Sequence, residues 1–446
     1  MRTIANLVGG LLAILLVSAP ARAQQINWTQ VEQQATATLQ QYIRINTTDP
    51  PSNTVKSADL LESIFKREGI PVTRYVSAPG KAIILARLKG SGQGRPILLL
   101  NHMDVVPADA SRWREGVFSG TILNGEMWGR GAMDMKGLGV IELYAMLALK
   151  RSGVHLTRDV LFEADPDEEI GGAGGARWMI AHHWAELNPE YVLDEGAFGS
   201  RDLYVPNKLV FGISVEEKRV VWIRVTATGV SGHASQPTDQ NPNDELVKAL
   251  ARLVSAPMPT GSVAIINRMK ATLGTLSSNK FMNAIQHSTI ALTTMKAGEG
   301  SPAKVNVIPG TADATLDCRL LPGVNPAGWV ALITRRLDDP KLKVDVMYQS
   351  EGSTLTPTDT PMYHALESAI RRVHPDATVV PVLVPYGTDS NTFREHGAKS
   401  YGLYPIIAPT ELVNTMHGDN ERMPVAQLKP GIQIVYDMLR QVAGGK

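Results

Sequence analysis

His102 and Asp104 stand two residues apart, directly after an apolar run (97–100) that suits a buried strand. Side chains alternate along a strand, so these two side chains should point to the same side. In α/β sheets, ligand sites usually lie at the carboxyl ends of the strands. The spacing fits a metal-ligating histidine whose other ring nitrogen is held by a carboxylate. A strand end whose polar residues cap a turn explains the stretch equally well.

A second candidate is Asp134, the one acidic side chain in the glycine-rich stretch 128–137. Glycine allows sharp turns and a close approach of the backbone to a ligand. An apolar helical pattern follows at once, so Asp134 could also be a residue that caps the start of that helix. On its own this stretch leaves both interpretations open.

Carboxylates also gather after two further predicted strands. Glu168 and Glu169 follow a strand at 160–163, and Asp194 and Glu195 follow a strand at 191–193. Adjacent carboxylates repel one another, so crowding them at a sheet edge is costly unless a cation neutralises them. The alternative is an acidic helix N-terminus, which the helix dipole favours. His417 lies in a loop before the last predicted helix.

Taken together, these clusters place two histidines and several carboxylates on one edge of one sheet. Such a donor set suits a pair of Zn²⁺ ions. Two metal ions can polarise a carbonyl group and activate a water molecule. One acidic side chain must then stay free of metal to carry the proton from that water to the leaving amine.

The predicted elements place these residues in a layered α/β domain with a second domain inserted into it. Helices (138–150, 173–183) alternate with strands up to 193, and this alternation returns after residue 351. Between 219 and 349 the pattern changes to two β-α-β halves, as in a ferredoxin-like sandwich. Residues 257–287 interrupt that pattern and are predicted to be an insertion that either blocks dimerisation or shapes the pocket.

The first 23 residues are predicted to be a cleavable signal peptide. Arg2 is followed by an apolar run and by Ala21-Arg22-Ala23, an A-x-A cleavage site. We therefore expect a periplasmic or secreted protein that is not attached to a membrane after cleavage. The predicted domains are 24–218 and 351–446 for the two parts of the catalytic domain, and 219–350 for the insert.

Composition excludes some partners. The chain has 44 basic and 43 acidic residues and a formal net charge of +1, which argues against nucleic acid as a partner. Cys318 is the only cysteine, so no intramolecular disulfide can form.

The motifs, in this order and spacing, resemble the M20 metallopeptidases over nearly all of the mature chain. The motifs are His102-x-Asp104, Gly129-Arg130-Gly131 with Asp134-Met135-Lys136-Gly137, Asp167-Glu168-Glu169, Leu193-Asp194-Glu195-Gly196 and His417-Gly418. The opening at 46–51 and the stretch 193–196 look most like the carboxypeptidase S and N-acyl-amino-acid amidase branch. The resemblance implies an α/β/α catalytic domain with an inserted ferredoxin-like lid or dimerisation-type domain.

The resemblance also implies a role for each residue at the sheet edge. His102 and His417 would each bind one Zn²⁺, and Asp134 would bridge the two ions. Glu169 would be one terminal carboxylate, and Asp194 or Glu195 the other, with a slight preference for Asp194. Asp104 would orient His102, and Glu168 would be the general acid/base. The cofactor would be two Zn²⁺ ions per subunit, with Co²⁺ or Mn²⁺ as alternatives that depend on availability.

In the inserted domain, the resemblance implies that His233 stabilises the oxyanion and that Asn306 and Arg319 hold the substrate carboxylate. In dimeric members of the family, the histidine reaches across to the partner's site. Gly387 and Thr388 would line the substrate pocket. The expected activity is hydrolysis of an amide bond next to a free carboxylate, in a small peptide or in an N-acyl amino acid. A non-catalytic binding module is the third alternative, and either a monomer or a homodimer is open.

Overall fold

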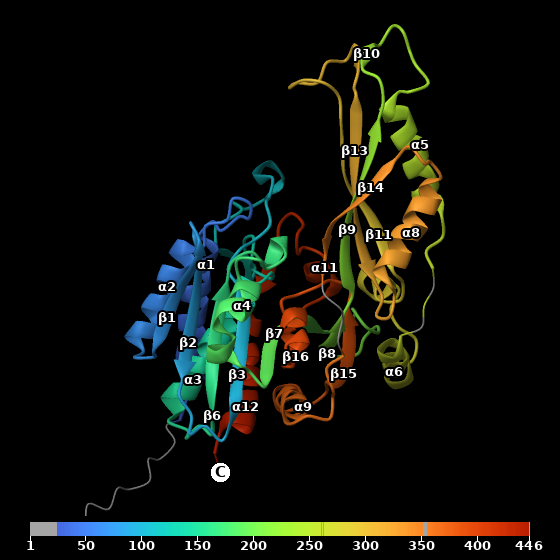
Figure 1. The fold of residues 1–446 in the computed structure, drawn as a ribbon. Coiled ribbons are helices and arrows are strands. Elements are labelled where there is room, and N and C mark those ends of the chain that lie inside the picture. Colours follow the sequence, from blue (N-terminus) through green and yellow to red (C-terminus); the bar gives the residue numbers. More distant parts are fainter. Residues whose placement is uncertain (1–24, 260, 262, 351–354, 446) are drawn as a thin grey trace, which may run out of the picture.

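The computed structural model describes residues 25–259, 261, 263–350 and 355–445, so the predicted signal peptide lies outside the described residues. Its centre is an eight-stranded sheet with the strand order β1-β2-β6-β3-β7-β16-β8-β15 (Figure 1). The strands are β1 (Val72–Ala78), β2 (Lys81–Leu88), β3 (Gly94–His102), β6 (Arg158–Asp165), β7 (Tyr191–Ser200), β8 (Val210–Glu217), β15 (Thr378–Val384) and β16 (Lys399–Ile407). Among the described helices, none is long and apolar enough to cross a membrane.

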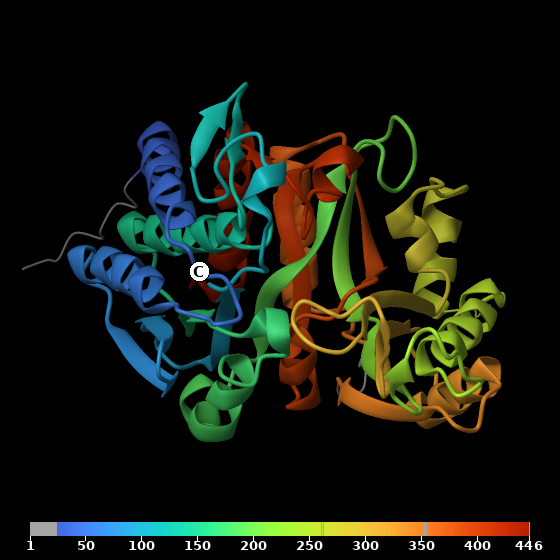
Figure 2. The same ribbon diagram turned by 90° about the horizontal axis from the view of Figure 1, so that it is seen from above.

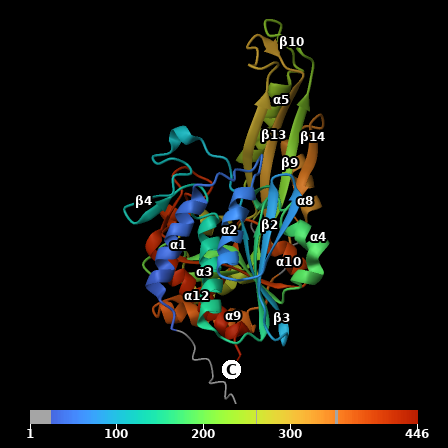
Figure 3. The ribbon, with the colours of Figure 1, turned by 90° about the vertical axis from the view of Figure 1, so that its left-hand side faces the viewer.

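Helices cover both faces of this sheet, so its strands are buried on both sides. Ile84, Leu99 and Phe162 face one layer, whereas Leu85 and Leu98 face the other. The first layer consists of α1 (Trp28–Ile43), α2 (Val55–Arg67), α3 (Lys136–Ser152), α9 (Pro361–Val373) and α12 (Leu428–Ala443). The second layer consists of α4 (Ala176–Leu187) and α10 (Ser390–Glu395), on the opposite side of the sheet in Figure 3. The predicted α/β/α architecture is confirmed.

The central strands run in the same direction, which brings their carboxyl ends to one edge. In the parallel pairing of β3 with β6, His102 lies opposite Asp165, and in the pairing of β3 with β7, Leu99 lies opposite Leu193. The pairing of β7 with β16 shifts at Glu195: Asp194 lies opposite Gly402, but Leu403 lies opposite Ala197. Glu195 and Gly196 therefore form a bulge, which can redirect a side chain.

A four-stranded antiparallel sheet with the order β11-β13-β9-β14 forms a separate layer, which we call the lid. Its strands are β9 (Arg219–Thr228), β11 (Thr289–Ala297), β13 (Thr311–Leu320) and β14 (Lys343–Gln349). Two helices, α5 (Pro242–Ser255) and α8 (Pro326–Leu337), pack on it around a core of their own. This is the predicted ferredoxin-like arrangement, and Figure 2 shows it beside the large sheet.

Residues 257–287 form two helices, α6 (Ala264–Leu273) and α7 (Lys280–Ala284). Although they interrupt the lid in sequence, Ile266, Met269 and Met282 belong to the core of the large sheet. The Ser277 N–H donates to the backbone oxygen of Tyr204 at 2.7 Å. The two helices of the insertion therefore pack on the catalytic domain, while Pro257 at its start accepts a hydrogen bond from Arg336 of the lid at 2.6 Å.

A small sheet with the order β17-β5-β4 lies near the ends of the two loops that carry Asp134 and His417. Its strands are β4 (Thr121–Leu123), β5 (Glu126–Trp128) and β17 (Arg422–Pro424). Because β17 follows His417 and β5 precedes Asp134, the pairing of β17 with β5 brings the two loops together.

Candidate metal centre and active site

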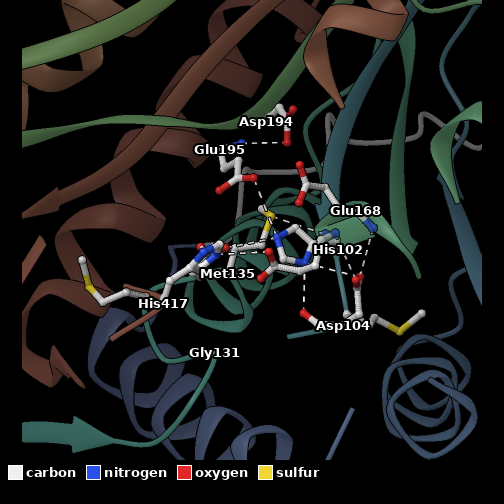
Figure 4. A network of polar contacts seen from close by, with 12 residues as sticks. His102, Asp104, Gly131, Met135, Glu168, Asp194, Glu195 and His417 are labelled. Carbon is white, nitrogen blue, oxygen red and sulfur yellow. Dashed lines mark hydrogen bonds and ion pairs between the residues drawn. The ribbon is translucent and has the colours of Figure 1, made fainter. Parts of the chain in front are cut away.

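Two groups of ligand-type side chains meet at the edge of the large sheet and share Asp134. Figure 4 shows His102, Glu195 and His417 of these groups close together. One group is His102, Asp134 and Glu195; the other is Asp134, Glu169 and His417, and within each group the donor atoms lie within 4.8 Å of one another. Asp134 Oδ1 lies 3.2 Å from His102 Nε2, and Asp134 Oδ2 lies 3.1 Å from His417 Nε2. Each oxygen of Asp134 thus faces a different histidine, as a bridging carboxylate requires.

The terminal carboxylates of the two groups are Glu169 and Glu195. Glu169 Oε2 lies 3.0 Å from His417 Nε2, and Glu195 Oε1 lies 3.7 Å from His102 Nε2. Asp194 instead accepts the backbone N–H of Glu195 at 2.7 Å and that of Ser390 at 2.8 Å. The slight preference for Asp194 as a ligand is therefore wrong in this geometry. The bulge in β7 turns Glu195 toward the histidines, and sequence alone cannot show that.

The charges of the cluster fit a site for cations. Burial lowers the pKa of His417, but hydrogen bonds with Asp134 and Glu169 outweigh it and raise this pKa to about 11. Glu169 Oε1 is buried, and no described residue donates a hydrogen bond to it. A divalent cation would take the place of imidazole protons between these carboxylates and would satisfy the remaining oxygen.

Asp104 supports the cluster from behind. His102 Nδ1 lies 3.0 Å from the backbone oxygen of Asp104 and 3.5 Å from its carboxylate Oδ1. Because a carbonyl oxygen can only accept, Nδ1 donates this hydrogen bond and leaves Nε2 as the metal-facing nitrogen. The Asp104 carboxylate also accepts the backbone N–H groups of Glu168 and Glu169, at 3.3 and 3.2 Å.

Glu168 lines the cavity in front of the cluster but belongs to neither ligand group. It lies in a single helical turn (Glu168–Ile170), and the Asp104 carboxylate anchors the start of that turn. Burial, followed by repulsion from Glu195, raises the pKa of Glu168 well above its ordinary value. A carboxylate with a raised pKa that is not a ligand suits proton transfer near neutral pH.

The cavity has a volume of about 510 Å³ and lies between the metal-type cluster and the lid. One part of its lining is apolar and aromatic, and another part is cationic. The apolar residues are Val220, Trp222, Phe281, Tyr386, Val413 and Met416, and the cationic ones are Arg177, Lys218, Lys280 and Arg319. Lys280, Phe281 and Ala284 come from α7, so the insertion shapes the pocket.

Three of the predicted substrate residues line this cavity: Arg319, Gly387 and Thr388. Arg319 makes a bidentate pair with Asp317, with Nε at 2.6 Å and the terminal nitrogen at 2.9 Å from the two carboxylate oxygens. The Thr388 N–H donates to Glu217 at 2.7 Å, which fixes the loop at the cavity wall.

His233 and Asn306 are not near the cluster of the same chain. His233 lies in β10 (Gly232–His233), at the far end of the lid in Figure 1, and is exposed. The backbone oxygen of Asn306 accepts the N–H of Ala234 at 3.0 Å at the same end, and neither residue lines the cavity. Within one chain, the structure does not bring these two residues to the site.

Sequence reasoning missed several residues that organise the site. Buried Glu421 and Arg130 connect the two ligand loops, Glu217 holds Thr388, and Phe281 and Tyr386 form a wall of the cavity. Two signals were available: Glu421 lies in the same loop as His417, and Arg130 belongs to the glycine-rich stretch that carries Asp134. No spacing rule relates Glu421 to the distant residues whose N–H groups it binds.

Residues 98–441 match the family described as Peptidase family M20/M25/M40. The match covers most of the chain, so the protein belongs to this family. It is therefore an enzyme of the metallopeptidase and amidohydrolase type that hydrolyses amide bonds, and membership implies a metal cofactor.

The similar proteins include both peptidases and enzymes of N-acyl amino acids. The chain is 27% identical over 376 residues to a probable carboxypeptidase S-like protein 2 of Dictyostelium discoideum, covering 78% of this chain and 71% of that protein. It is 28% identical over 425 residues to the N-fatty-acyl-amino acid synthase/hydrolase PM20D1 of Mus musculus, covering 87% and 83%. The structure of the di-peptidase Dug1p from Saccharomyces cerevisiae superposes with a TM-score of 0.72 at 16% identity, covering 93% and 98%.

Proposed function

We propose that the enzyme uses two Zn²⁺ ions to hydrolyse an amide bond next to a free carboxylate. The observation that carries this proposal is the pair of ligand groups that share Asp134, with Glu168 beside them and outside both. His102 and Glu195 would hold one ion, His417 and Glu169 the other, and Asp134 both. Co²⁺ or Mn²⁺ would suit the same donors.

When bound, the two ions would polarise the scissile carbonyl and activate a water molecule. The remaining steps belong to side chains of the chain. Glu168 takes the proton of the attacking water and returns it to the leaving amine. Asp104 keeps His102 in the required tautomer and keeps the backbone of Glu168 in place.

The free carboxylate of the substrate would bind on the cationic side of the cavity. Arg319 faces the cavity from β13, and a guanidinium can bind a carboxylate through two parallel hydrogen bonds. Its pairing with Asp317 uses the edge formed by Nε and one terminal nitrogen, which leaves the edge between the two terminal nitrogens for the substrate.

A second candidate is hydrolysis of N-acyl amino acids, and the apolar wall of the cavity favours it. Phe281 and Tyr386 lie with their ring centroids 6.4 Å apart, and Met416 and Val413 continue the wall toward His417. An apolar acyl chain would bury more of this surface than a small dipeptide would. Alanine-terminated dipeptides and N-acyl amino acids of increasing chain length, assayed on metal-loaded enzyme, separate the two candidates.

We also infer that the active unit is a homodimer. His233 and Asn306 lie at the free end of the lid, away from the cluster of their own chain. A second copy related by a twofold axis would bring its own lid end to this cluster, and its His233 would then stabilise the oxyanion.

Export to the periplasm or to the medium remains a proposal that rests on residues 1–23. N-terminal sequencing of the mature protein should give a start at Gln24. Metal analysis of the same sample should give two Zn²⁺ ions per chain. A mature chain that still begins at Met1 would contradict the proposed export, and metal-free active enzyme would contradict the proposed mechanism.

A further inference from the structure

Glu421 is a fully buried carboxylate that lies outside both ligand groups. Its Oε1 accepts the backbone N–H groups of Met133 at 2.8 Å and Asp134 at 3.0 Å. Its Oε2 accepts the N–H of Gly131 at 3.1 Å and a guanidinium N–H of Arg130 at 2.7 Å. All these donors belong to the loop that carries the bridging carboxylate. A single side chain thus fixes the backbone of that loop.

Arg130 connects the same carboxylate to the other ligand loop. It is 2% exposed, and its second terminal nitrogen donates to the backbone oxygen of Gly418 at 2.9 Å. Gly418 follows His417, whose φ of +57° lies in the left-handed region that residues other than glycine rarely adopt. Such a backbone persists where the surroundings restrain it. Arg130 provides one such restraint.

We propose that Glu421 and Arg130, here called the loop clamp, set the position of Asp134 relative to His417 and so tighten one metal site in particular. This inference rests on the proposed two-metal function. The site formed by Asp134, Glu169 and His417 depends on both clamped loops. The other site also contains Asp134, but this is its only ligand on a clamped loop, because His102 and Glu195 lie on strands and Asp104 fixes the ring of His102.

If Glu421 and Arg130 only stabilised the fold, their loss would have a different effect on metal binding. It would lower the stability of the whole chain and would weaken both metal sites alike, or neither. Loss of the loop clamp should weaken the His417 site more than the His102 site, because two of the three ligands of the His417 site lie on clamped loops and only Asp134 does in the other. These two outcomes are distinguishable by titrating the metal-free enzyme with Zn²⁺.

The first test compares Glu421→Gln with Glu126→Gln. Glutamine keeps the shape of Glu421 but replaces one acceptor oxygen with an NH₂ group, so it cannot accept all four hydrogen bonds. Glu126 accepts a hydrogen bond from Arg422 at 2.9 Å in the same small sheet and belongs to neither ligand group, so it is the matched control. In Glu421→Gln we expect the affinity for one Zn²⁺ to fall about tenfold or more and the affinity for the other to fall clearly less. Equal weakening at both sites, or none, would overturn the proposal.

The second test needs no metal. Hydrogen exchange of the amides of Gly131, Met133 and Asp134, measured on metal-free protein, should be faster in Glu421→Gln than in wild type and control. Unchanged exchange would overturn the loop clamp. A wild type that binds fewer than two ions would count against the proposed two-metal function, while the exchange result still decides the clamp.

If Glu421→Gln does not fold, Arg130→Lys can be titrated with Zn²⁺ in its place. Lysine keeps the positive charge beside Glu421 but replaces the planar fork that spans Glu421 and Gly418 with a single nitrogen. It should release the His417 loop and weaken the His417 site more than the His102 site. Wild-type affinity at both sites in this variant would also contradict the proposal.

Discussion

The carboxylate of Asp104 accepts the backbone N–H of Glu168 at 3.3 Å, while the backbone oxygen of Asp104 lies 3.0 Å from Nδ1 of His102. One residue therefore orients a proposed metal ligand and anchors the proposed acid/base. This relationship couples the position of the metal site to the position of the group that moves the proton.

Replacing Asp104 with Asn should loosen the anchor of Glu168 and remove the charge that lies 3.5 Å from Nδ1 of His102, while the backbone hydrogen bond to Nδ1 stays. The N–H groups of Glu168 and Glu169 donate to different oxygens of Asp104, and asparagine would turn an NH₂ group toward one of these two donors. We expect kcat/KM to fall about 10- to 100-fold, as for other residues that support a metal ligand. Exposed Asp109, which accepts a hydrogen bond from Ser111, provides the control Asp109→Asn. Equal activity of the two variants would remove this role of Asp104.

Replacing Arg319 with Ala should weaken the binding of substrates with a free carboxylate more than the binding of their amidated analogues. A hydrogen bond to a charged group contributes about 1.5–3 kcal/mol, so KM for the carboxylate substrates should rise about tenfold or more. The measurement is KM for matched pairs of substrates. Because the variant leaves Asp317 unpaired, the double variant Arg319→Ala with Asp317→Asn is assayed beside it. Equal rises in KM for both substrate types would contradict the binding of the substrate carboxylate by Arg319.

If His233 acts in the partner's site, two inactive variants should complement each other. Glu168→Gln and His233→Ala would be mixed after reversible dissociation, and each mixed dimer would then contain one intact site. Random pairing gives half mixed dimers, so the mixture should recover roughly a quarter of wild-type activity. Activity no higher than the sum of the separate variants would contradict an exchange of His233 between chains.

Glu216 should make the fold less stable as the pH rises toward neutral. Burial raises the pKa of Glu216 to about 7, although Arg394 lowers it. The carboxyl of the folded chain therefore keeps its proton until the pH reaches about 7, whereas the carboxyl of the unfolded chain loses it near the ordinary pKa of 4.5. The stabilisation is present below that ordinary pKa and is lost as the pH rises to about 7.

The measurement is thermal unfolding of wild type and Glu216→Gln across this pH range. The Tm of the wild type should fall by about 2–4 °C relative to the variant between the two pKa values. Parallel Tm curves for the two proteins would show that Glu216 titrates normally.

The sequence predicted the edge of the sheet better than the details of the site. His102 and the acidic clusters follow apolar runs, and parallel strands bring such ends together, so the gathering of these residues could be foreseen. The central strand β16 (Lys399–Ile407) was missed because Gly402 and Pro405 interrupt its apolar run, and both residue types are depleted in strands.

The choice between Asp194 and Glu195 depends on a bulge, which adjacent acidic residues do not reveal. The function of Glu421 depends on contacts with residues 130–134, and no local pattern connects such distant segments. Similarly, α7 showed no clear periodicity because it is short, yet it provides Phe281 to the cavity wall.

The most direct test of the account is the rate of amide hydrolysis by Glu168→Gln, with the zinc content measured on the same sample. Glutamine keeps the size of Glu168 but cannot take a proton from water. We expect that two Zn²⁺ ions stay bound and that kcat falls about 10²- to 10⁴-fold. A variant that binds two ions and hydrolyses its substrate at nearly the wild-type rate would contradict it.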